Sequence, residues 1–263
     1  MILNYIEQLP NWALFIIFPI ASWAALVLLT SIFRRCSKIL GLDDFDSDII
    51  DTATQNAMSG AYVVLGFVLV LVMATANDID SNISKEASQI EALDRLLIME
   101  GSPSSKIARQ SLHAYTKSIV GDEWGRLVSG EQDSATRLHA DKLHHDVSLL
   151  QPNTPRQAAL FSEITKASNE VTQYRNLRIL NSQSRMPNLF WQLSYLTLLG
   201  VIAIAALRLM QPSPIRILAL AIQLAMISWL FATVMILDLP YLGQIKTSPE
   251  AFEKAIQVMQ SRP

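Results

Sequence analysis

Four long apolar stretches constrain this 263-residue chain more than any other feature. A helix that spans a bilayer needs about 20 mostly apolar residues. Four segments meet this length, over about 12–33, 57–76, 189–209 and 215–237. None of them carries Asp, Glu, Lys, Arg or His in its interior, since Arg208 and Arg216 stand at the ends of the third and fourth. The sequence therefore predicts an all-α protein with four transmembrane helices in two pairs.

The charged residues are concentrated between the two pairs. The chain is 51% hydrophobic and only 17% charged, and most of its charges fall between Asp78 and Arg185. We therefore expect a soluble helical bundle at 77–187, inserted between the second and third spans. The first pair of spans then occupies 1–76 and the second pair 188–238. The tail, 239–263, is expected to pack on the bundle. The net charge of -2 argues against nucleic acid as a partner, because such proteins normally present a basic face.

The insert has clear helix signals. Apolar residues recur every three or four positions at Ile79, Ile83, Ala87, Ile90, Leu93 and Leu97, as on one face of a helix. Ser102 and Pro103 are typical of a helix start, and this second helix is expected to end near 130. A third helix is predicted at about 133–150, and Thr154 with Pro155 starts a fourth.

The second span and the first soluble helix have no obvious break between them. No Gly or Pro occurs between Gly66 and Gly101, which favours one continuous helix. The alternative is a break at Asn77 and Asp78, whose short polar side chains can cap a new helix. The residues leave both possibilities open.

Several motifs follow one another in a recognisable order. Leu65-Gly66-Phe67 lies inside the second span, Glu86-Ala87 and Glu123-Trp124 lie in the insert, and the tail begins with a motif formed by Asp238, Pro240, Tyr241 and Gly243. With the span pattern, this order resembles a bacterial membrane family called bestrophin-like and, more distantly, the bestrophins. The resemblance implies an oligomeric ion channel, a pentamer of identical subunits that conducts inorganic ions, mainly anions, across a lipid bilayer.

The resemblance also assigns the pore to the second span. It places Ser59, Val63, Phe67 and Val70 on the narrow pore face, and their spacing of three and four fits one helix face. The alternative is that this face packs against neighbouring helices, with Gly60 and Gly66 permitting close contact. A rival stripe is equally regular and consists of Tyr62, Leu65, Leu69, Val72 and Ala76.

The chemistry of the spans restricts the mechanism. Without an ionisable group at membrane depth, a hydrophobic constriction that gates by dewetting is favoured over a charged selectivity ring or a proton-coupled transporter. The segment after the tail motif lacks the acidic run of calcium-gated bestrophins, so no calcium clasp and no cofactor are expected.

No metal site and no catalytic site are expected. Asp44, Asp46 and Asp48 lack the Gly and Glu of a calcium loop. His139, His144 and His145 do not share a helix face, so a solvated surface is favoured over a metal site. No known catalytic motif occurs, which argues against an enzyme.

The sequence leaves two possibilities open for the orientation in the membrane and two for the function. The basic residues after the first span favour an insert outside the cytoplasm. The resemblance instead implies a bacterial inner membrane with the insert and both termini in the cytoplasm, and we follow it. The second functional hypothesis is a non-conducting sensor or scaffold whose insert binds a partner protein.

Overall fold

The structure is a computed structural model that describes residues 10–40, 47–127, 133–183, 186–238 and 248–262. These residues form helices joined by short connections, and no strand occurs among them. The chain divides into two compact units, one of residues 1–76 and 185–245 and one of residues 77–184 and 246–263. The two units are described separately below.

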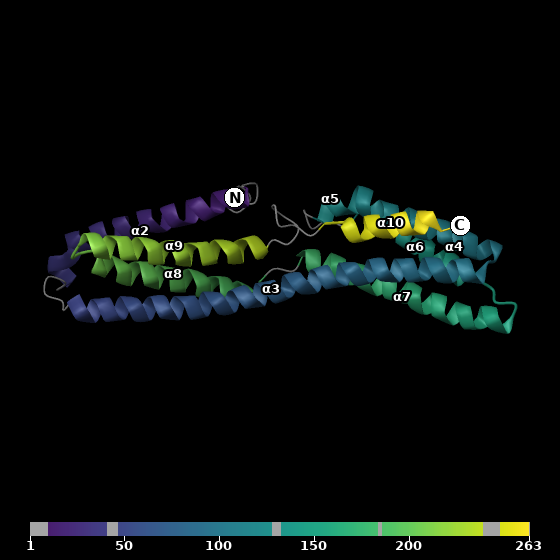
Figure 1. The fold of residues 1–263 in the computed structure, drawn as a ribbon, viewed down its shortest axis with the longest axis horizontal. Helices are drawn as coiled ribbons and strands as arrows, with labels where there is room; N and C mark the ends of the chain where they lie inside the picture. Colours follow the sequence, from purple (N-terminus) through teal and green to yellow (C-terminus); the bar gives the residue numbers. More distant parts are fainter. Residues whose placement is uncertain (1–9, 41–46, 128–132, 184–185, 239–247, 263) are drawn as a thin grey trace. The chain divides into compact units, whose positions relative to one another are not determined.

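Four long apolar helices build the first unit. They are α2 (Asn11–Leu40), the N-terminal part of α3 (Ser47–Glu100), α8 (Asn188–Arg208) and α9 (Pro214–Leu237), and they run side by side in Figure 1. Each is long and apolar enough to cross a membrane. The predicted four spans of a multi-pass membrane protein are therefore confirmed.

The interior of the first unit is apolar and closely packed. Leu26, Leu65 and Phe231 are almost fully buried, one from each of α2, α3 and α9. Hydroxyl groups inside it are hydrogen-bonded, as Ser228 Oγ is by donating to Ser22 Oγ at 2.9 Å and Thr30 Oγ1 by donating to the Leu26 carbonyl at 2.8 Å. Because no water is available at membrane depth, a hydroxyl group without a hydrogen-bond partner would be costly there.

Helix α3 is continuous from Ser47 to Glu100. Of the two possibilities that the sequence left open, the structure has the single helix, and the break at Asn77 and Asp78 does not occur. It ends at Gly101, whose φ of 76° is a conformation that glycine adopts without steric cost. The following Ser102 accepts a hydrogen bond from the Ser105 N–H and caps the next helix.

The second unit combines the C-terminal part of α3 with shorter helices. These are α4 (Pro103–Ser118), the π-helical segment η1 (Ile119–Glu123), α5 (Trp124–Leu127), α6 (Ser134–Ser148), α7 (Pro155–Gln183) and α10 (Glu250–Ser261). The predicted starts of the second and fourth helices are confirmed, and Thr154 Oγ1 accepts from the Gln157 N–H. The second helix differs from the prediction, because a π-helical turn interrupts it before 127.

The C-terminal helix α10 packs within the second unit through one apolar face. Phe252, Ala255 and Met259 are buried on this face, at spacings of three and four. Arg109 of α4 donates from Nη2 to the carbonyl oxygens of Met259 and Arg262, both at 3.1 Å. These bonds satisfy carbonyls that a helix end otherwise leaves unpaired.

Candidate functional site

The face of α3 that carries the candidate pore residues is exposed in the single chain. Val63, Phe67 and Val70 are 69%, 78% and 67% exposed, and Ser59 is exposed as well. The rival stripe lies on the inner side, where Leu65 and Val72 are buried and Tyr62, Leu69 and Ala76 are half-buried. The four helices thus use the rival stripe for their own packing.

Two glycines lie beside this exposed face. A methyl group added at Gly60 or Gly66 would meet no atom within 4 Å. Neither glycine is therefore required for close helix contact inside one subunit. If they serve close contact, the contact lies between subunits.

The one described residue of the tail motif, Asp238, binds elements within the first unit. Its Oδ1 accepts from the Met186 N–H at 2.8 Å, and its Oδ2 accepts from Trp191 Nε1 at 3.1 Å. The carboxylate thereby connects the end of α9 to the start of α8. The other residues assigned to the motif, Pro240, Tyr241 and Gly243, lie outside the described residues.

A buried ionic cluster occupies the interior of the second unit. Arg178 of α7 is fully buried, and its Nε donates to Glu86 Oε2 at 2.8 Å. Its Nη2 donates to Glu86 Oε1 at 3.3 Å and to Glu123 Oε2 at 2.9 Å. Tyr115 completes the cluster by donating from its hydroxyl to Glu86 Oε1 at 2.7 Å. We call these four residues, Glu86, Tyr115, Glu123 and Arg178, the ionic cluster. The cluster connects three helical segments. They are α3, α7 and the continuous segment formed by α4 and η1.

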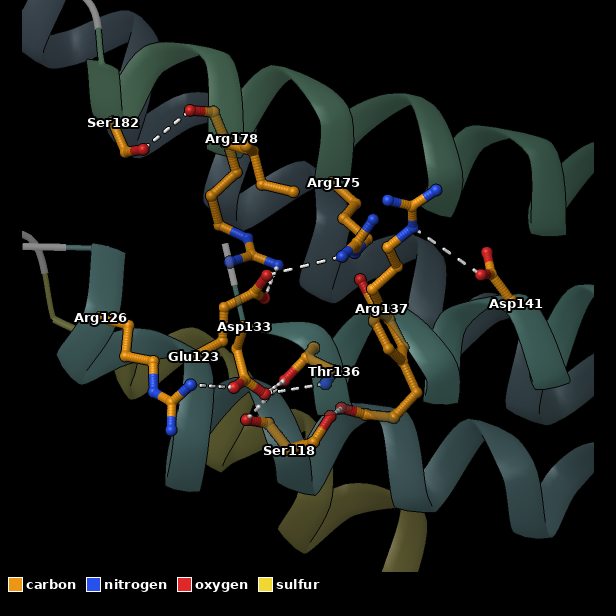
Figure 2. Close-up of polar contacts among 12 residues, drawn as sticks. Ser118, Glu123, Arg126, Asp133, Thr136, Arg137, Asp141, Arg175, Arg178 and Ser182 are labelled. Atoms are coloured by element: carbon orange, nitrogen blue, oxygen red, sulfur yellow. Dashed lines mark hydrogen bonds and ion pairs between the residues drawn. The ribbon is translucent and has the colours of Figure 1, made fainter. Parts of the chain in front are cut away.

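Neighbouring side chains extend the ionic cluster. Figure 2 shows Arg175 and Arg178 reaching from α7 towards Glu123, and Arg175 Nη2 lies 3.6 Å from Glu123 Oε1. The Phe252 ring of α10 lies 5.5 Å from Arg178 Cζ, a cation–π distance. Phe252 also meets Trp124 edge to face, with ring centroids 5.9 Å apart. The C-terminal helix therefore closes over the cluster with an aromatic side chain.

The ionisation of the cluster follows from burial and charge. Burial, followed by the negative charge of Glu86, raises the pKa of Tyr115 well above its ordinary value, so this phenol stays a hydrogen-bond donor. Burial by itself would lower the pKa of Arg178, but the charges of Glu86 and Glu123 outweigh it and raise that pKa. The Arg178 guanidinium is held between two carboxylates by three hydrogen bonds, while its Nη1 and Glu123 Oε1 are buried without a hydrogen-bond partner.

The π-helical turn explains how Glu123 reaches the cluster. The Trp124 N–H bonds to the Ile119 carbonyl, five residues earlier, and this wider turn accommodates one extra residue. Glu123 and Trp124 are therefore both buried, although adjacent residues of an α-helix point about 100° apart. The glutamate reaches Arg178 while the tryptophan reaches Phe252.

The ionic cluster was not predicted from the sequence. Glu86 and Glu123 were recognised only as motif residues, and Arg178 was not expected on a buried face. One sequence signal was available, because Glu86 lies three residues after Ile83 and four before Ile90, within the apolar stripe. A charge inside such a stripe predicts a buried partner.

The three histidines considered as metal ligands all belong to α6. His144 and His145 are exposed on α6, and His139 is half-buried. Asp44 and Asp46 lie outside the described residues. Among the residues that the structure describes, no three His, Cys, Asp or Glu side chains are grouped as a metal site would require.

The fold and these sites define an all-helical, multi-pass membrane protein with a second helical unit organised around a buried ion pair. The family model described as Bestrophin-like domain matches residues 20–252. The chain belongs to this family of channel-like membrane proteins, and the resemblance inferred from the motifs is confirmed.

A solved structure shows the same fold. The chain is similar to the crystal structure of a membrane protein, with a TM-score of 0.65 and 10% sequence identity. The similarity covers 94% of this chain and 99% of the other. At this identity the likeness concerns the fold alone. A search of curated proteins finds no match.

Proposed function

We propose that this chain is the subunit of a homo-oligomeric ion channel in which α3 lines the pore. Ser59, Val63, Phe67 and Val70 form the narrow section. The observation that carries the proposal is the exposed face of α3 in a chain of the Bestrophin-like domain family. The supporting contrast is that the rival stripe of the same helix is already used for packing inside the subunit.

A pore of this kind requires several subunits. The described interior of the four-helix unit is lined mainly by apolar side chains that pack against one another. The exposed face of α3 can line a water path only when other copies stand around it. A pentamer is the number that the family resemblance suggests.

The lining residues support gating by hydrophobic exclusion of water. Phe67 is 78% exposed, so its ring is free to project from the subunit. A ring of phenylalanines from several copies would narrow the path without any charge. Water leaves a narrow apolar section readily, which stops ion flow unless the section widens.

The preference for anions is the part of the proposal that rests on the family resemblance. Arg34, Arg208 and Arg216 lie at one end of the first unit, where Arg34 donates to the Leu209 carbonyl and the other two pair with Asp51. Asp48 lies in the first turn of α3 at the same end, so the charges there are of both signs and do not by themselves favour anions.

The proposal is tested by recording purified protein in planar bilayers with a KCl gradient. We expect currents whose reversal potential lies towards the chloride equilibrium value, and a Phe67→Ala variant with larger currents. Phe15→Ala is the matched control, because Phe15 is an exposed phenylalanine of the same unit on α2. Absence of current in chloride and potassium salts, with Phe67→Ala equal to wild type, would refute channel function.

Subunit number and orientation are tested separately. Native mass measurement is expected to give a homo-oligomer, and a monomer or dimer would favour a non-conducting scaffold. A reporter fused at the C-terminus is expected to report a cytoplasmic tail in a bacterial inner membrane.

A further inference from the structure

A pocket with a basic lining lies in the second unit, between α4 and the C-terminal end of α10. Its volume is about 700 Å³, within the usual range for small-molecule sites. Lys106, Arg109, His113, Lys117 and Arg262 contribute to the lining, and no Asp or Glu does. This concentration of positive charge contrasts with the net charge of -2 of the chain.

The two arginines of the pocket are held in place from behind. Asp94 is fully buried and accepts from Arg109 Nε at 2.8 Å and from Arg262 Nη1 at 3.1 Å. One carboxylate thus balances two guanidiniums and fixes their positions. Glu91 offers only a longer contact to Arg262, at 3.8 Å.

The lysines supply further charge on the open side. Lys106 and Lys117 are exposed, and neither forms an ion pair with any residue that the structure describes. With His113 between them at spacings of seven and four, they lie along one face of α4. Eleven residues of helix correspond to about 16 Å, so the basic face is elongated.

The pKa of His113 depends on its burial and on the charges around its ring. Its Nε2 lies 3.5 Å from Asp94 Oδ1 and its side chain is 23% exposed. Burial lowers the pKa of His113, and the charges of Arg109 and Lys117 lower it further against the opposing effect of Asp94. The imidazole is therefore neutral at pH 7 and surrounded by excess positive charge.

We propose that this pocket binds a small anion with two or more phosphate or carboxylate groups beside His113. The flexible side chains of Lys106 and Lys117 supply positive charge from either side of it along α4. Lysine and arginine are the usual partners of such groups, and the fixed guanidiniums lower the entropic cost of binding. The site is separate from the candidate pore face, and its test does not depend on conduction.

The test is a titration of purified full-length protein with inorganic pyrophosphate, followed by NMR of histidine ring carbons. The four histidines are His113, His139, His144 and His145, and the last three, on α6, are internal controls. Bound anion favours the imidazolium, so we expect saturable binding that raises the pKa of His113 alone. Orthophosphate is expected to bind more weakly, and added KCl to weaken both.

The variants make the test specific. Lys106→Gln with Lys117→Gln is expected to weaken pyrophosphate binding by about tenfold, the loss expected from two partly exposed charge contacts. Lys85→Gln on α3, an exposed lysine away from the pocket, is expected to change nothing. No saturable binding, or equal binding by the double variant, overturns the proposal. The titration is repeated with the protein in nanodiscs with and without phosphatidylglycerol. If His113 responds only when this lipid is present, the bound phosphate belongs to a lipid headgroup and the soluble-anion site is overturned.

Discussion

Replacement of Arg178 by methionine tests whether the ionic cluster is the structural centre of the second unit. The variant removes the three hydrogen bonds of the guanidinium. It leaves the fully buried Glu86 without its cation and the fully buried Glu123 with only Arg175, at 3.6 Å. Removal of one partner from a buried ion pair costs about 3–5 kcal/mol. For a unit of this size, the melting temperature is expected to fall by about 10–20 °C.

The assay must report on the second unit alone. Trp124 is the only tryptophan in residues 77–184 and 246–263, and it contacts Phe252 beside Arg178. Protein labelled with 5-fluorotryptophan gives one ¹⁹F signal for each of five tryptophans. The Trp124 signal is assigned by its loss in Trp124→Phe, and its change with temperature gives the melting curve of the second unit.

Two further variants decide the interpretation. Arg137→Met is the matched control, because Arg137 is 67% exposed and lies 3.9 Å from Asp141; we expect a fall below about 2 °C. A triple variant that combines Arg178→Met with Glu86→Gln and Glu123→Gln is expected to recover only part of the loss, since it removes both buried carboxylates but leaves Arg175 without its partner. If Arg178→Met shifts the melting temperature no more than Arg137→Met, the reasoning is refuted.

Three further outcomes follow from single contacts. Tyr115→Phe removes the donor to Glu86 and should cost about 1–2 kcal/mol in the same melting assay; an unchanged curve would contradict the buried bond. Asp238→Ala should move the ¹⁹F signal of Trp191, whose indole N–H loses its acceptor, and an unmoved signal would argue against this contact. Because the pKa of His113 is lowered on folding, the unfolded chain binds the proton more readily below about pH 6.5, and stability falls as pH decreases from 7 to 5. His113→Gln should reduce this fall, and an equal fall would show that other groups cause it.

Local sequence features predicted much of the fold. The four spans were recognised from runs of about 20 apolar residues, and each is long and apolar enough in the structure. Ser102 with Pro103 marked the start of α4, because capping and a proline at the first helical position act within one turn. The π-helical turn at Ile119–Glu123 escaped prediction, since no local pattern distinguishes it from an α-helix.

The candidate pore face, too, was predicted only in part from the sequence. Helical spacing placed Ser59, Val63 and Phe67 on one face of α3, but an equally regular stripe ran along another face. The choice between packing and exposure came from the neighbouring helices, which cover Leu65 and leave Phe67 open. Whether the open face lines a pore stays a prediction.

The sequence by itself identified four segments that are long and apolar enough to span a membrane, and the starts of helices between them, because hydrophobic length and helix caps act over neighbouring residues. The tertiary structure decided which charges are buried together. Glu86 and Arg178 are 92 residues apart, and they meet only because α3 and α7 pack in one register. Contacts between residues far apart in the sequence depend on that packing, which no local pattern encodes. The packing of the helices therefore decides where both the ionic cluster and the basic pocket lie.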